Sequence, residues 1–144
     1  MYIDASAIVA VLAEEAGAST LLGRIGAAQP PFYVSPLTLY EATVSLAAKL
    51  ARQTGLPNDA ALISRTQAAV AEFVATLGAR EILISSDIGR RALEAAKLYG
   101  RTGGHPADLN FGDCFAYACA KAYRAPLLYK GDDFAHTDVN DGVG

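Results

Sequence analysis

The sequence predicts a three-layer α/β/α sandwich, in which helices cover both faces of a central parallel sheet. The first observation behind this prediction is that short apolar segments alternate with longer amphipathic ones along the whole chain. The second is the composition, because 52% hydrophobic and 19% charged residues are typical of a globular chain. The third is that no internal repeat, linker or low-complexity tract divides the 144 residues, which favours one domain over residues 1–144.

The apolar segments are predicted to be strands because each is short and bounded by turn-forming residues. In the second segment, Pro30 and Pro31 act as breakers before a strand of three or four residues. The third is rich in β-branched residues. The four segments are MYID (1–4), PPFYVS (30–35), REILISSD (80–87) and PLLYKG (126–131).

The amphipathic segments are predicted to be helices. The clearest spans residues 35–55, where Ser35 is placed as N-cap, Pro36 lies in the first turn and Gly55 lies near the end. The loop at residues 101–110 is rich in turn residues, and the chain end from residue 137 is expected to be frayed. The other five helices are expected at residues 5–15, 18–28, 58–78, 86–100 and 111–125.

The charge and cysteine content limit the possible functions. A formal net charge of −3 argues against nucleic-acid binding by bulk positive charge. This net charge does not exclude a local basic rim around an acidic, metal-loaded centre. Cys114 and Cys119 are five residues apart on one predicted helix and face different ways, so we expect reduced thiols and no disulfide. No signal peptide or transmembrane run is evident, and we expect a cytoplasmic protein with no membrane partner.

Acidic residues follow two of the predicted strands. Asp4 ends the first strand, and Asp132 and Asp133 follow the last one. Since ligands collect at the carboxyl ends of parallel strands, we expect these side chains to be neighbours. Acids after strands are also common as caps of the next helix, which explains each residue taken alone equally well.

Two further acids lie on predicted helices. Glu41 shares its helix face with small and apolar residues at positions 37, 38, 44, 45 and 48, where an ionised side chain needs a partner. Asp113 lies in the first turn of the helix predicted at 111–125. The simpler interpretations are that Glu41 reaches water from the border of the apolar stripe and that Asp113 interacts with the helix dipole.

A divalent cation would explain all four positions together. Four carboxylates in one pocket repel one another and have raised pKa values, and a hard cation removes that conflict. Mg²⁺, or Mn²⁺ in its place, prefers carboxylate oxygens and water, and can orient a phosphodiester and generate a nucleophile from water near neutral pH. We therefore expect Asp4, Glu41, Asp113 and one acid of the 132/133 pair to share a metal ion.

Three segments carry a family resemblance: MYIDASAIVAVL, SPLTLYEATVSL and GGHPADLNFGDCFAYACAKAYRAPLLYKGDDFAHTDV. Together they resemble the PIN-domain toxins of the VapC family, from the first residues to about Val139. The resemblance implies a single PIN domain and a Mg²⁺-dependent endoribonuclease, the toxin of a toxin–antitoxin pair. It also implies RNA cleavage by in-line attack of a metal-activated water, a 5′-phosphate product, inhibition by a cognate antitoxin, and a homodimer whose acidic pockets open into a shared groove.

The resemblance assigns the site residues. Asp4, Glu41 and Asp113 match the first, second and third metal-binding acids of the family. The fourth acid is ambiguous within KGDDF, and Asp133 is the better match because the position before it looks freer to vary. Ser6 matches a small hydroxyl residue that steadies the pocket. The resemblance does not identify the RNA target or the antitoxin.

The alternative function is a non-catalytic, acidic Mg²⁺-binding module of the receiver type. Such a module needs a phosphoacceptor Asp at the end of a central strand and a Lys late in the chain. Lys130 is available, but Asp87 follows its strand only after two serines. A phosphatase with an Asp-x-Asp motif is disfavoured because the chain has Asp4-Ala5-Ser6 at this point, so the second carboxylate is missing.

Four other residues are expected to have plainer roles. His105 and His136 lie in turn-like, polar contexts, where we expect loop or surface histidines. Tyr40 and Tyr117 occur at helical spacing, which favours positions in the core over positions in a pocket.

Overall fold

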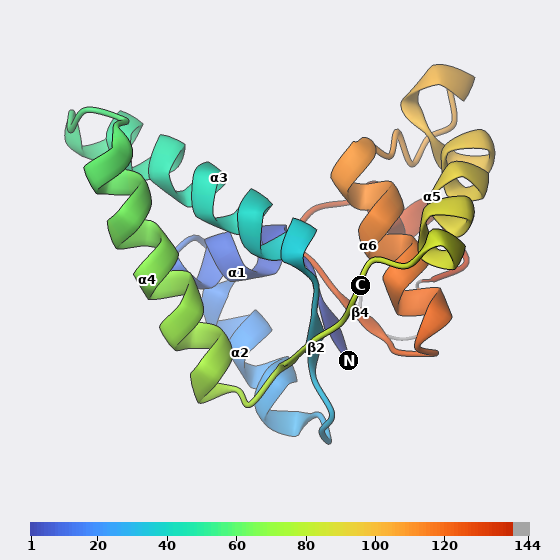
Figure 1. Ribbon diagram of the computed structural model, residues 1–144, viewed down its shortest axis with the longest axis horizontal. Coiled ribbons are helices and arrows are strands. Elements are labelled where there is room, and N and C mark those ends of the chain that lie inside the picture. Colours follow the sequence, from blue (N-terminus) through green and yellow to red (C-terminus); the bar gives the residue numbers. More distant parts are fainter. Residues whose placement is uncertain (140–144) are drawn as a thin grey trace.

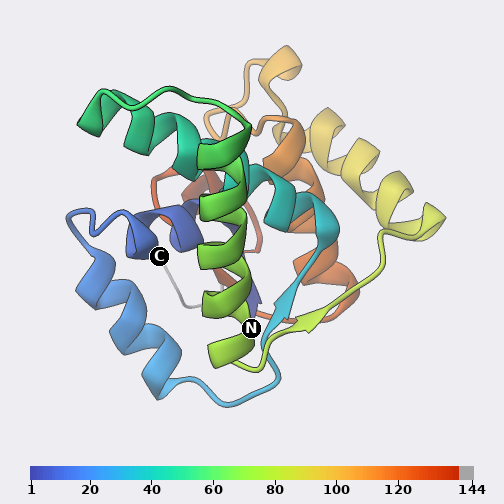
Figure 2. The ribbon, with the colours of Figure 1, turned by 60° about the vertical axis from the view of Figure 1, so that its left-hand side comes forward.

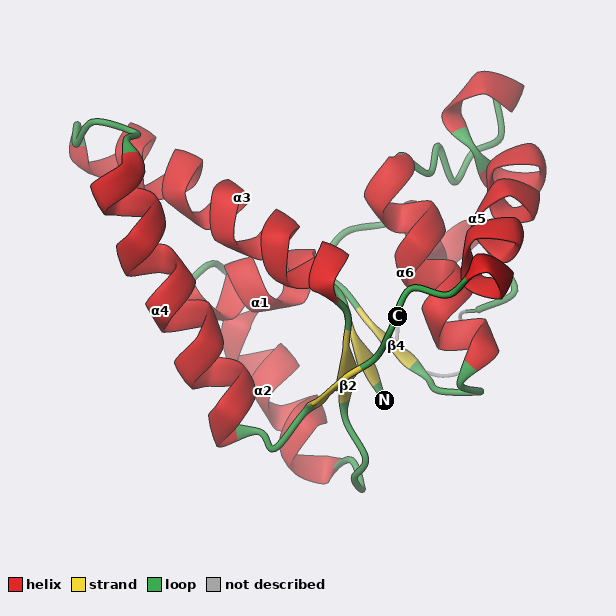
Figure 3. Ribbon diagram, in the orientation of Figure 1, coloured by secondary structure: helices red, strands yellow, loops and turns green. Residues whose placement is uncertain are grey.

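Within the described part of the chain, four two-residue strands form one parallel sheet in the order β3-β2-β1-β4 (Figure 3). The computed structural model describes residues 1–139 of the 144. Tyr2 of the central strand lies opposite Tyr33 on one side and opposite Leu127 on the other. The strands are β1 (Tyr2–Ile3), β2 (Tyr33–Val34), β3 (Arg80–Glu81) and β4 (Leu127–Leu128).

Helices cover both faces of this sheet, so the predicted three-layer α/β/α architecture is confirmed (Figures 1 and 2). Four helices belong to one layer: α1 (Ala5–Leu12), α2 (Ala18–Ala27), α3 (Pro36–Thr54) and α4 (Ala60–Thr76). Two helices form the other layer: α5 (Ser86–Tyr99) and α6 (Phe111–Ala122). A short 3₁₀ turn, η1 (Arg101–Gly103), lies between α5 and α6, and a second, η2 (Asp133–His136), follows β4.

The strands divide their side chains between two cores. Tyr2 and Leu127 pack with α5 and α6, whereas Ile3 and Leu128 pack with the helices of the other layer. Successive strand residues point to opposite faces of a sheet, so both β1 and β4 are apolar on both sides. This burial on two faces explains why these strands appear in the sequence as continuous apolar runs.

The helix boundaries follow the local signals of the sequence. Ser35 caps α3 by accepting a hydrogen bond from the Thr38 backbone N–H at 3.3 Å, and Gly55 ends that helix with a φ of 73°. Asp59 caps α4 in the same way through the Leu62 N–H at 3.0 Å. Within residues 1–139, no helix is both long and apolar enough to cross a lipid bilayer.

The third predicted strand is the main difference from expectation. Only Arg80 and Glu81 pair with β2, residues 82–85 are irregular with Leu83 80% exposed, and Ser86 and Asp87 already belong to α5. β3 is an edge strand whose only neighbour is β2, and β2 ends at Val34, directly before the N-cap of α3, so residues beyond Glu81 have no strand to pair with.

Three other expectations need correction. The first helix ends at Leu12 and not at residue 15. Tyr117 is buried as expected, but Tyr40 is 68% exposed and does not belong to the core. Of the segment expected to be frayed, residues 138 and 139 are held in place, because Asp138 accepts a hydrogen bond from Tyr117 at 2.5 Å and Val139 is buried. Residues 140–144 lie outside the described residues.

A buried hydroxyl cluster connects three elements of the fold. The Tyr2 hydroxyl of β1 donates to Ser35 Oγ at 2.8 Å and lies 2.7 Å from Thr38 Oγ1. The thiol of Cys119 on α6 also contacts this hydroxyl. Both cysteines are buried free thiols, as predicted. The cluster therefore joins β1, the start of α3 and the middle of α6.

Replacement of Tyr2 by phenylalanine tests this cluster. Tyr2→Phe keeps the buried ring but removes the hydrogen bonds that join the Tyr2 hydroxyl to Ser35 and Thr38, so the free energy of unfolding should fall by about 1–2 kcal/mol. Urea unfolding measures the change. Tyr40→Phe is the control, because that ring is exposed and its change should stay within about 0.5 kcal/mol. Equal stability of the two variants would contradict a structural role for the cluster.

Candidate functional site

An acidic cavity of about 390 Å³ opens where β1 and β4 end. Asp4, Glu41, Asp113 and Asp133 all line it. The structure therefore brings together the four acids that the sequence singled out, although they are separated by as many as 129 positions. Asp132 is not among the lining residues, which agrees with the preference for Asp133.

Asp4 is held by the first turn of α1. It is the N-cap of that helix, and its Oδ2 accepts hydrogen bonds from the Ser6 backbone N–H at 2.9 Å and from Ser6 Oγ at 2.5 Å. Its own backbone N–H donates to the Leu128 carbonyl at 2.9 Å, which fixes it beside β4. Asp4 is only 4% exposed, and this burial raises the pKa of its carboxyl against the lowering effect of Ser6.

Asp113 is held by a capping box at the start of α6. Its carboxylate accepts from the Asn110 backbone N–H at 2.9 Å, while Asn110 Oδ1 accepts from the Asp113 N–H at 3.0 Å. Burial, opposed by the Asn110 hydrogen bond and assisted by the negative charges of Asp4 and Asp133, raises the pKa of Asp113 to about 6. Asp113 therefore stabilises the start of α6, as its simpler interpretation suggested, and also lines the cavity.

Glu41 reaches the cavity from the second turn of α3 and lies against the backbone of α6. A Cβ added to Gly112 would stand 2.2 Å from Oε2 of Glu41, so only glycine leaves room for this carboxylate. Burial raises the pKa of Glu41 to about 7, with smaller contributions from the charges of Asp4 and Asp113. Glu41 thus points inward, and not out to water as its simpler interpretation suggested.

Asp133 completes the cavity from the loop after β4. It is exposed and begins η2. Gly131, two residues earlier, has a φ of 108°, a conformation that favours glycine and turns the chain back toward the cavity. The charge of Asp133 acts on both Asp4 and Asp113, which shows that the four carboxylates share one electrostatic environment.

The donor set fits a hard divalent cation. Carboxylate oxygens line the cavity, and their mutual repulsion is the conflict that such an ion relieves. As they stand, the His, Cys, Asp and Glu side chains of residues 1–139 contain no group of three or more arranged to hold a metal ion. Asp4 and Asp113 are buried and hydrogen-bonded, whereas Glu41 is half-buried and Asp133 exposed, so all four would have to hold the ion from positions of unequal freedom.

Several residues of the cavity were not identified from the sequence. Asn110 and Glu15 line it, and Gly112 makes room for Glu41. The NFGD motif contained a signal for Asn110, since Asn followed three residues later by an acid matches a capping box. Gly112 gave no such signal, because its role depends on a helix that is distant in the sequence.

Other candidates lie elsewhere. His105, His136 and Tyr117 do not line the acidic cavity, and His105 packs edge-on against Tyr99. Asp87, the acid considered for a receiver-type module, is exposed in the first turn of α5, where it pairs with Arg91 at 2.7 Å. The receiver-type alternative therefore finds no support in the geometry.

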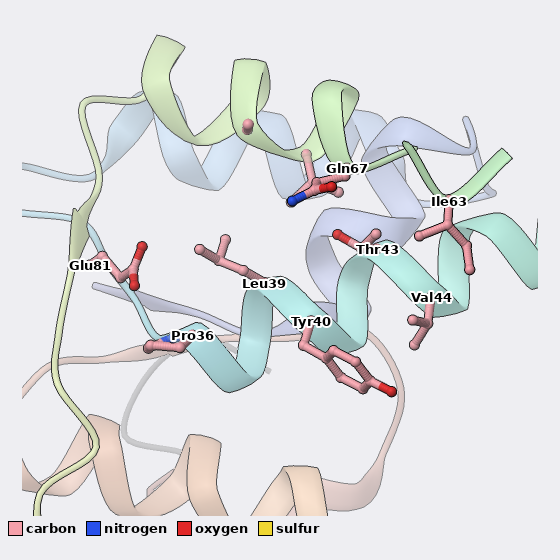
Figure 4. A pocket seen from close by; sticks show the side chains of 10 residues that line it. Pro36, Leu39, Tyr40, Thr43, Val44, Ile63, Gln67 and Glu81 are labelled. Carbon is pink, nitrogen blue, oxygen red and sulfur yellow. The ribbon is translucent and has the colours of Figure 1, made fainter. Parts of the chain in front are cut away.

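A second cavity of about 460 Å³ lies between α3 and α4 (Figure 4). Figure 4 shows the apolar side chains of Leu39, Val44 and Ile63 around it, with Glu81 at one end. It shares no lining residue with the acidic cavity. One acid among mostly apolar neighbours does not form a metal site.

Comparison with known proteins finds a family and relatives that match nearly the whole chain. The profile of the PIN domain matches residues 1–140. A VapC ribonuclease of Rhizobium meliloti (strain 1021) is 42% identical over 139 residues, covering 96% of this chain and 98% of the relative. Ribonuclease VapC42 of Mycobacterium tuberculosis (strain H37Rv) is 36% identical and covers 96% of both chains.

Two solved structures have the same fold. The crystal structure of Mycobacterium tuberculosis VapC20, a toxin that cleaves the sarcin–ricin loop, superposes with a TM-score of 0.62 at 19% identity, covering 93% of this chain and 92% of VapC20. A toxin–antitoxin complex from Klebsiella pneumoniae superposes with a TM-score of 0.63 at 21% identity, covering 96% and 93%.

The raised pKa of Glu41 predicts a pH-dependent loss of stability in chelator. Between about pH 4.5 and pH 7 the folded chain holds a proton on Glu41 that the unfolded chain has released. The free energy of unfolding should therefore decrease as pH rises through this interval. Urea unfolding at pH 5, 6, 7 and 8 measures it. Glu41→Gln should flatten this decrease, and Glu94→Gln, an exposed change on α5, should not; identical pH profiles for all three proteins would contradict the prediction.

Gly112→Ala should empty the cavity of Glu41 without unfolding the chain. The new methyl group displaces the end of a flexible side chain, and alanine favours the helix by up to about 1 kcal/mol over glycine. We expect an unchanged or higher melting temperature together with a lower affinity for Mg²⁺ in calorimetric titration. Gly89→Ala on α5, where no atom lies within 4 Å of the added Cβ, is the control and should keep the parent affinity. Parent affinity in Gly112→Ala would contradict the steric argument.

Proposed function

This chain belongs to the PIN-domain family and, within it, to the VapC ribonucleases, and on that premise we propose that it is a divalent-cation-dependent endoribonuclease acting as the toxin of a toxin–antitoxin pair. The observation that carries the proposal is the cavity in which Asp4, Glu41, Asp113 and Asp133 converge. Carboxylates at this density repel an RNA phosphate unless a cation lies between them.

The four acids are proposed as the ligands of Mg²⁺, with Mn²⁺ as a substitute. When bound, the ion would supply the positive charge that orients a phosphodiester and makes a water molecule more acidic. Asp4 and Asp113 are the fixed members of the set, because each is buried and held by hydrogen bonds to its own helix start. Glu41 and Asp133 are the adjustable members, which complete the set from α3 and from the loop after β4.

Several residues of the chain prepare the site for this reaction. Ser6 orients Asp4 through two hydrogen bonds, and the Asn110 backbone N–H keeps one oxygen of Asp113 in place. Preorganised ligands reduce the rearrangement needed when ion and substrate bind. Glu41, whose pKa is about 7, is proposed to lose its proton when the cation binds, since the cation favours the charged carboxylate.

A cognate antitoxin is the proposed inhibitor, acting in the cytoplasm where the RNA substrate is found. The four-acid cavity suits a basic side chain of such a partner, which would pair with the carboxylates and exclude the substrate. A homodimer with acidic cavities opening into one groove is the proposed assembly.

Asparagine variants test the proposed reaction. Asp4→Asn and Asp113→Asn remove one charge from the ligand set and should lower cleavage of total RNA by about two orders of magnitude or more. Asp133→Asn should also be impaired. Chelator should abolish wild-type cleavage and added Mg²⁺ or Mn²⁺ should restore it.

Asp132→Asn is the matched control, because it changes the neighbouring acid that does not line the cavity and should keep near-parent activity. Circular dichroism verifies the fold of each variant. Full activity of folded Asp113→Asn, or wild-type cleavage undiminished in chelator, would refute the proposed mechanism.

A further inference from the structure

Lys130 is the only cationic side chain among the described residues that line the acidic cavity. Its backbone position is fixed by the site itself, since the Lys130 N–H donates to Ser6 Oγ at 3.0 Å and Ser6 Oγ in turn donates to Asp4. Gly131 turns the chain immediately afterwards. Lys130 is therefore anchored one hydrogen-bonded residue away from a proposed metal ligand.

The Lys130 side chain pairs with Glu15, which lines the same cavity and also pairs with Lys49 of α3. Lys49 contacts Oε1 and Lys130 contacts Oε2, so one carboxylate holds two ammonium groups side by side. The two cations lower the pKa of Glu15, which keeps its charge and hence the arrangement. Two lysines and one glutamate leave a net positive charge on this rim.

The backbone before Glu15 is arranged to present it. The first helix stops at Leu12, and Glu14 adopts a φ of 51°, a left-handed conformation that is uncommon outside glycine. The Glu15 N–H returns to the Ala10 carbonyl at 2.9 Å. This turn ends α1 at Leu12, before residue 15, where the sequence pattern predicts the end of the helix. It places Glu15 at the rim of the cavity.

Stability does not account for this group. The side chains of Lys49, Lys130 and Glu15 are 27%, 37% and 18% exposed, and partly exposed ion pairs contribute about 0–1 kcal/mol to folding. Each lysine has three donors, so it can bind Glu15 and an oxygen of another molecule together. A cationic rim next to four acids is what a polyanion requires in order to approach them.

We propose that Lys130 and Lys49, held together by Glu15, bind phosphates of the RNA backbone beside the one presented to the acidic cavity. This inference rests on the proposed function for the identity of the polyanion. RNA is favoured over an acidic protein segment because Lys130 lines the cavity that must receive a phosphodiester, and Lys49 is paired with Glu15 of the same cavity. The strand thus contacts the rim through its phosphates whatever its sequence.

The test measures RNA binding without cleavage, in the Asp113→Asn background. The probe is a fluorescein-labelled 30-nucleotide single-stranded RNA of random sequence, titrated by anisotropy from 50 to 300 mM KCl. Adding Lys130→Ala or Lys49→Ala should weaken binding several-fold and reduce the slope of log K against log [KCl] by about 0.7, the release expected for one phosphate contact on a single strand. Lys130→Arg should keep the slope because it keeps the charge.

Lys97→Ala is the matched control. It removes a lysine from an exposed ion pair with Glu94 on α5, and neither residue lines the cavity. Its slope should equal that of the parent. In the active protein, Lys130→Ala should raise KM for RNA and leave kcat nearly unchanged, a division that simple misfolding would not produce.

The outcomes separate this inference from the proposed function. A parent slope in both lysine variants, or a change no larger than that of Lys97→Ala, overturns the phosphate contacts even if the wild type cleaves RNA. In that outcome an acidic protein segment becomes the better candidate to bind the two lysines. A slope reduced as expected supports the contacts even if the wild type fails to cleave RNA, in which case the nuclease proposal alone is lost.

Discussion

Four carboxylates that repel one another occupy one cavity, and the fold has to hold them there. The parallel sheet supplies the first constraint, because the Asp4 N–H bonded to the Leu128 carbonyl places the end of β1 beside the end of β4. Burial and mutual repulsion raise the pKa values of the acids and show the cost of this arrangement. Such a cost is typical of functional sites, where local stability is given up for chemistry.

The buried hydroxyl cluster is the second constraint. Tyr2 lies two residues before Asp4, Ser35 begins the helix that carries Glu41, and Cys119 is on the helix that carries Asp113. Hydrogen bonds among these groups, buried where water cannot replace them, therefore fix the relative positions of three acid-bearing elements. These contacts are polar and neutral, so they position the acid-bearing elements without adding charge to an already acidic site.

The simpler and the functional interpretations of two acids turn out to be compatible. Asp4 caps α1 and Asp113 forms a capping box at the start of α6, as acids after strands and in first helical turns commonly do. Capping uses one oxygen and orients the carboxylate along the helix start. The same hydrogen bonds that begin each helix thus also aim a carboxylate at the cavity, so helix formation and site formation depend on the same residues.

The amino-acid sequence alone determined where α3 begins and ends, at Ser35 and Gly55, and that β1 and β4 are apolar. It also identified the four acids as candidates for one site. Caps, turns and burial patterns act within a few residues, so the local sequence records them. Tertiary structure alone decided that only Arg80 and Glu81 join the sheet, since the only strand beside them, β2, ends at Val34. It also decided that Glu41 needs a glycine at position 112 and that Glu15 joins Lys49 to Lys130. These contacts link residues up to 115 positions apart, and no local pattern records which distant side chain will fill a space or balance a charge.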